Sequence, residues 1–144
     1  MTSDKEGISF LYASKKERES MLIKCMAVGA GGFIGSIARY VLSKAKLQSS
    51  GQYPINTLLT NVIGAIVIGI VIAEAQKNGM SEEKLLFLKF GFCGGLTTFS
   101  TFSAELYGCI ESGNTMLAIG YALASVTLSL IGVIAGIKLV SCWP

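Results

Sequence analysis

The chain has 144 residues, of which 51% are hydrophobic and 15% are charged, and its formal net charge is +3. A soluble domain carries about 25% charged residues, and the basic residues do not cluster as nucleic-acid binding requires, so the composition favours a membrane protein. There is no histidine and no carboxylate pair suited to acid–base work, so we do not expect an enzyme. The four cysteines lack CxxC spacing, which favours packing over a zinc site.

The first element is a polar arm, residues 1–20, which contains eight charged side chains. We predict that it forms a mobile arm or a short surface helix, outside a transmembrane domain that covers 21–144. An apolar run follows at 22–42. It is long enough to cross a bilayer, which takes roughly 20 apolar residues. Its Gly31 and Gly35 form a GxxxG pair that suits close helix packing.

The second apolar run covers 56–73, and the fourth covers 115–140. Between the second and third runs, Ser81 is predicted to cap a helix whose first turn holds Glu82 and Glu83, where the helix dipole favours negative charge.

The third apolar run covers 85–110, and its middle contains two glycines followed by two threonines. This pattern predicts a break in the helix near Gly94 and Thr97. Inside a bilayer, such backbone is tolerated only where it is buried in protein or lines a cavity. The sequence therefore predicts an all-α membrane protein with four transmembrane helices, the third of them broken.

The distribution of charge leaves the orientation open. Beyond residue 20, five basic residues flank the side that holds the N-terminus, and three flank the other side. That bias is weak for a rule that normally sets topology. Either the basic arm holds the N-terminus in the cytoplasm, or the chain inserts in both orientations. The residues are Lys24, Lys77, Lys84, Lys89 and Lys138 on one side, and Arg39, Lys44 and Lys46 on the other.

Polar residues at membrane depth need a reason, because burying them in lipid is costly. Asn61 can form a hydrogen bond between helices. Phe99 and Phe102 lie three residues apart and share a face, and ring edges carry positive partial charge. Two such edges can hold a small anion, although core or lipid-facing phenylalanines would give the same pattern.

Hydroxyl groups lie beside these features. Ser100 and Thr101 follow Phe99, and a stripe spaced by four contains Tyr121, Ser125 and Ser129. Such a stripe can pass a desolvated ion from donor to donor, or it can join helices. For Arg39 and Glu105, the charges that remain inside the spans, we favour structural roles.

Three segments together resemble the Fluc-type (CrcB) family of fluoride channels, and the resemblance covers about 22–140. The segments are GGFIGSIARY (31–40), NTLLTNVIG (56–64) and GFCGGLTTFSTFSAE (91–105). The resemblance implies an antiparallel, dual-topology homodimer with two fluoride pores, a central structural Na⁺ and a bacterial inner membrane location. It implies passive export of F⁻ that lowers cytoplasmic fluoride.

The resemblance also implies roles for individual residues. The fluoride pathway would contain Asn61, Phe99 and Phe102, with a polar track of Ser100, Thr101, Tyr121, Ser125 and Ser129. Arg39 would lie near the pore vestibule, and the backbone carbonyls of Gly94 and Thr97 would hold the Na⁺.

Two alternatives remain at this point. A small multidrug-type dual-topology antiporter has four helices but needs a membrane carboxylate for proton exchange, and the first span has none. A non-transporting assembly protein would explain the GxxxG pairs, which are Gly31–Gly35 and Gly132–Gly136. It would leave the polar stripe and the helix break without a purpose.

Overall fold

The computed structural model describes residues 3–45 and 54–142, and side-chain surroundings from residue 17 onward within those ranges. Every regular element in the described ranges is helical. Four helical stretches are long and apolar enough to cross a membrane. This confirms the predicted number of spans. They are Glu17–Ser43, Ile55–Asn78, Glu82–Glu111 and Thr115–Ser141.

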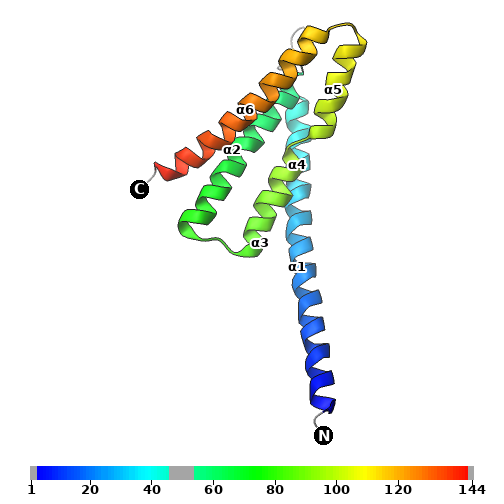
Figure 1. Ribbon diagram of the computed structural model, residues 1–144, viewed down its shortest axis with the longest axis vertical. Helices are drawn as coiled ribbons and strands as arrows, with labels where there is room; N and C mark the ends of the chain where they lie inside the picture. Colours follow the sequence, from blue (N-terminus) through cyan, green and yellow to red (C-terminus); the bar gives the residue numbers. More distant parts are fainter. Residues whose placement is uncertain (1–2, 46–53, 143–144) are drawn as a thin grey trace.

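The first helix, α1 (Ser3–Ser43), has 41 residues and runs without interruption through the polar arm into the first span. Figure 1 shows it as a long rod that projects beyond the other helices. Residues 1–2 of the predicted arm lie outside the described residues. At about 1.5 Å per residue the rod is roughly 60 Å long, about twice the thickness of the hydrocarbon core.

The spans pack in two pairs (Figure 1). Helix α2 (Ile55–Asn78) packs along α6 (Thr115–Ser141), whereas α1 packs against η1 (Leu86–Cys93) and α4 (Gly94–Leu96). Glycine allows both pairs to approach closely, because it has no side chain to separate the backbones.

The contact between α1 and η1 illustrates this packing. A Cβ atom added at Gly31 would lie 2.2 Å from the carbonyl oxygen of Phe87, and one added at Gly91 would lie 2.7 Å from that of Val28. The glycines of the two helices therefore face one another. Gly136 on α6 is equally close to the α2 backbone, with its added Cβ 2.2 Å from the oxygen of Ile66.

The start of the third span confirms the predicted cap. The Ser81 side chain accepts a hydrogen bond from the Lys84 backbone amide at the start of α3 (Glu82–Leu85). Glu82 also pairs with Lys24 of α1 at 2.6 Å.

The following element, η1, is a π-helix, a form that the sequence pattern did not predict. Such wide turns are frequent at functional sites.

Thr97 and Thr98 separate α4 from α5 (Phe99–Glu111). Both have extended backbone, with φ −80° and ψ 156° at Thr97 and φ −149° and ψ 117° at Thr98. This interruption fits the break expected from the Gly-Gly and Thr-Thr pairs. The Thr98 hydroxyl then caps α5 by accepting a hydrogen bond from the amide of Thr101.

Candidate functional site

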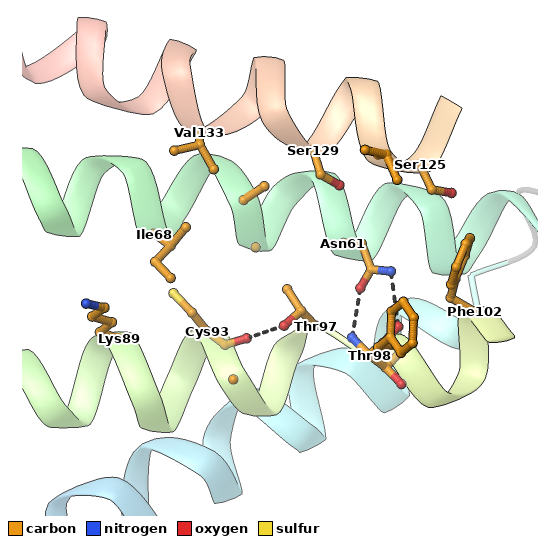
Figure 2. Close-up of a pocket in the computed structure, with 15 residues that line it drawn as sticks. Asn61, Ile68, Lys89, Cys93, Thr97, Thr98, Phe102, Ser125, Ser129 and Val133 are labelled. Carbon is orange, nitrogen blue, oxygen red and sulfur yellow. Dashed lines mark hydrogen bonds between the residues drawn. The ribbon is translucent and has the colours of Figure 1, made fainter. Parts of the chain in front are cut away.

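A cavity of about 490 Å³ lies between the two helix pairs, beside the interruption in the third span. Figure 2 shows α2 and α6 on one side of it and the third span on the other. Most of its wall is apolar, with polar groups at separated points. Its lining includes Asn61, Lys89, Cys93, Gly94, Thr97, Thr98, Phe99, Phe102, Ser125 and Ser129.

Asn61 holds the interrupted backbone in place. Its Oδ1 accepts a hydrogen bond from the Thr98 amide at 2.8 Å, and its Nδ2 donates to the Thr98 carbonyl at 3.2 Å (Figure 2). One side-chain amide thus satisfies both backbone groups of Thr98. Backbone polar groups at membrane depth need such partners because lipid offers none. The hydrogen bond between spans that the sequence suggested for Asn61 is present.

The two phenylalanines meet, but they lie in different surroundings. Their ring centroids are 5.5 Å apart with an interplanar angle of 41°. Phe102 is 9% exposed and Phe99 is 79% exposed in the single chain. Phe102 also contacts Tyr121, with centroids 5.1 Å apart. Neither pair is stacked face to face, because the rings are tilted by 41° and 50°.

The three hydroxyl side chains of the α6 stripe have different surroundings. Ser125 and Ser129 line the cavity, opposite the third span. The hydroxyl of Ser125 is buried and meets no hydrogen-bond partner by distance and angle among the described residues. It faces the Tyr121 hydroxyl, and its proton is free to turn toward a bound species. Tyr121 is not part of that cavity lining, and its hydroxyl donates to Glu105 Oε2 at 2.8 Å.

Glu105 has two partners that the sequence did not reveal. Its Oε1 accepts from the Thr57 hydroxyl at 2.7 Å, while Oε2 accepts from Tyr121. The carboxylate therefore links α2, α5 and α6. This agrees with the structural role favoured for Glu105. The contact of Thr57 with Glu105 could not be predicted, because the only notable feature of Thr57 in the sequence is its place one turn before Asn61.

A second cavity of about 390 Å³ is lined largely by hydroxyl side chains and by Arg39. Arg39 Nε donates to the Gly95 carbonyl at 2.9 Å, which places a cation at the C-terminal end of α4, where the helix dipole favours it. Thr101 lines this second cavity. Ser100 lines neither cavity, but its hydroxyl lies 3.2 Å from that of Thr98.

The carbonyl of Gly94 has lost its usual helical donor. In a continuous helix that donor would be the Thr98 amide, which here binds Asn61 instead. Gly94 is exposed in the single chain, and nothing lies within 4 Å of a Cβ added there. Among the described residues no group of three or more His, Cys, Asp or Glu could hold a metal.

Comparison with known proteins gives concordant matches. The sequence model described as "CrcB-like protein, Camphor Resistance (CrcB)" matches residues 26–137. The chain is 43% identical over 117 residues to a protein of Clostridium novyi (strain NT), covering 80% of this chain and 91% of that protein. It is 44% identical over 117 residues to a protein of Rhizobium meliloti (strain 1021), covering 79% and 93% respectively. Both relatives are named "Fluoride-specific ion channel FluC".

Proposed function

Because the chain belongs to the CrcB family, we propose that it is a fluoride-selective channel that lets F⁻ leave the cell passively. The observation that carries this proposal is its similarity, over about four-fifths of its length, to relatives named as fluoride-specific channels. The four apolar helices make it a multi-pass membrane protein. In a bacterial inner membrane it would drain fluoride that enters as the neutral acid and ionises inside.

The cavity has the chemistry that such a pathway needs. Fluoride is small and tightly hydrated, so a selective pore must replace water with other donors. The unpartnered Ser125 hydroxyl and the neighbouring Ser129 hydroxyl can donate to the anion. The edges of Phe102 and Phe99 add positive partial charge without a full cation. An anion bound by hydroxyl donors and ring edges is stabilised, and it can still dissociate because no full positive charge holds it.

Asn61 contributes by fixing the wall of the pathway. Both hydrogen bonds of its amide to Thr98 hold the backbone that presents Phe99 to the cavity. Ser100 and Thr101 lie beside this backbone, because their hydroxyls contact that of Thr98, and we propose that Tyr121 contributes to the pathway with them. In this chain, however, the Tyr121 hydroxyl donates to Glu105, so Tyr121 acts through its ring and its bond to that carboxylate.

The second half of the proposal is an antiparallel homodimer with two pores. Phe99 lines the cavity yet is 79% exposed in the single chain. A second copy would cover this ring and close the open side of each pathway. The exposed apolar face of α1 gives such a copy a surface to pack against, and Met26, Phe33, Ile37 and Tyr40 are among its side chains.

The family also implies a structural Na⁺ in the dimer, and the residues present fit it. Na⁺ is a hard cation that takes oxygen ligands, as unwound helices in transporters provide. The Gly94 carbonyl lacks its helical donor, and the Thr97 carbonyl lies in extended backbone. These two carbonyls from each copy would hold the ion, which would supply fixed positive charge and join the two broken helices. Arg39 lies near the same backbone, because its Nε donates to the Gly95 carbonyl.

The antiporter alternative is not favoured. The relatives are named as fluoride channels, and proton exchange needs a carboxylate that can release and rebind protons to a substrate site. Both oxygens of Glu105 are already engaged by Thr57 and Tyr121.

The proposal is tested by fluoride efflux from liposomes, read with a fluoride electrode, with chloride measured in parallel. A potassium ionophore dissipates the voltage. We expect fast fluoride loss that requires the ionophore, with chloride retained. Phe99→Ile and Phe102→Ile should strongly impair this flux in intact dimers, whereas Tyr107→Ile, which removes an exposed ring of α5 that does not line the cavity, should leave it unchanged. Absence of fluoride loss from well-folded wild-type protein would refute the function, and wild-type flux in both cavity variants would refute the ring-edge pathway.

A further inference from the structure

Lys89 lines the large cavity although it lies within an apolar span. Figure 2 shows its side chain at the end of the cavity opposite Asn61 and Phe102. Lys89, Cys93 and Thr97 are spaced by four along the third span and all line the cavity, so one face of that span leads from the lysine to the interrupted backbone.

The structure gives Lys89 no carboxylate partner in the part of the chain that it describes. Its Nζ lies 5.4 Å from the ring centroid of Phe90, a contact that leaves the charge uncancelled. Lys24 differs, because its ammonium pairs with Glu82 at 2.6 Å. The positive charge of Lys89 is therefore available to an anion that approaches the cavity.

The position of Lys89 along the third span would keep that charge in contact with water. Lys89 lies eight residues before Thr97, which is at most about 12 Å along the helix axis, because the π-helical turns of η1 rise less per residue than an α-helix does. Half of the hydrocarbon core is roughly 15 Å thick. If the interruption lies near the bilayer centre, the long side chain reaches the boundary, where lysine places its ammonium in water. A cation there attracts anions without desolvating and trapping them.

We propose that Lys89 is an anion-recruiting residue at this mouth of the cavity, which raises the local concentration of F⁻ before the ion loses its water. The inference rests on the proposed function, because it concerns delivery to the same pathway. The second cavity has its own cation in Arg39, but that guanidinium is bonded to the Gly95 carbonyl. Lys89 thus sets the charge at one entrance of the large cavity.

The first test compares Lys89→Gln with Lys84→Gln, an exposed lysine that does not line the cavity. Fluoride currents are recorded in planar bilayers of neutral lipid at low fluoride. One charge at about 7 Å in water changes the local ion concentration roughly threefold. We expect Lys89→Gln to lower the current about threefold at roughly 10 mM total salt. The deficit should vanish near 1 M of an impermeant salt, where the Debye length is only about 3 Å.

A second test changes the charge in an already folded channel. Lys89→Cys is treated with a cationic or an anionic methanethiosulfonate reagent, and the wild-type protein, which retains its four cysteines, receives the same treatment. The cationic reagent should restore the low-salt current and the anionic reagent should not.

The outcomes separate the two proposals. Equal currents in Lys89→Gln and wild type at low salt, or equal effects of the two reagents, would overturn the role of Lys89 while selective fluoride flux still stands. A lysine that only anchors the span to lipid headgroups would give this result. A wild-type protein without fluoride current would overturn the proposed function and the role of Lys89 together.

Discussion

The close backbone contact between α1 and the third span gives a quantitative test of the fold. A Cβ added at Gly31 would lie 2.2 Å from the Phe87 carbonyl oxygen, and one added at Gly35 would lie 2.2 Å from that of Phe92. Ordinary contacts of a Cβ begin at 3.4 Å. Alanine at either position therefore requires α1 to move away from η1 by about 1.2 Å, which is the difference between these two distances.

The expected cost follows from two opposing terms. Overpacking a close interface costs about 1–3 kcal/mol, and the facing atoms are backbone, which cannot move aside as a flexible side chain can. Replacing glycine by alanine inside a helix contributes up to about 1 kcal/mol of stability. We expect a net loss of about 2 kcal/mol in the free energy of unfolding for Gly31→Ala and for Gly35→Ala.

The same helix provides matched controls. Nothing lies within 4 Å of a Cβ added at Gly29, and the nearest atom to one added at Gly32 is 3.9 Å away. Alanine at these positions keeps the helical gain and avoids the clash, so it should be neutral or stabilising. Unfolding is followed by circular dichroism as sodium dodecyl sulfate is titrated into mild detergent. If Gly31→Ala were as stable as Gly29→Ala, the close approach of α1 and η1 would be wrong.

Three further predictions concern the polar groups and the arm. Asn61→Leu leaves both backbone groups of Thr98 without partners, so the same titration should show a loss of about 2–4 kcal/mol; a loss below about 1 kcal/mol would contradict the pairing. Tyr121→Phe removes one donor to Glu105 and keeps the ring, so stability should fall by about 1–3 kcal/mol, and an unchanged unfolding curve would argue against that bond. Removal of residues 1–20 should leave fluoride flux from liposomes unchanged, whereas a truncated protein that folds but does not conduct would show that the arm is needed.

Much of the architecture could be predicted because a bilayer imposes a simple length rule. The predicted run 56–73 lies within the helix Ile55–Asn78, and 115–140 lies within Thr115–Ser141. Local chemistry also sufficed for the Ser81 cap. The structure of the arm was harder to predict, because the charge of residues 1–20 does not indicate whether the helix of the first span continues through them.

The partners of the polar residues could not be predicted. Which side chain meets Glu105 depends on the rotation of three helices about their axes, and apolar spans that are hydrophobic on all sides carry no periodicity that fixes this rotation. The bond from Tyr121 therefore became visible only in three dimensions. The position of Lys89 in the cavity was hidden for the same reason, and its charge was counted only toward topology.

The interrupted backbone of the third span has a consequence for how the chain enters the membrane during synthesis. Its two side-chain partners, Asn61 for Thr98 and Arg39 for the Gly95 carbonyl, are both encoded upstream. A ribosome translating from the N-terminus has therefore already delivered α1 and α2 when the irregular segment emerges. The side chains that pair with the peptide groups of this segment are therefore already in the membrane when the segment arrives. Vectorial insertion thus spares this segment a period in lipid without partners, and a gene rearranged to encode the third span first would lose that protection.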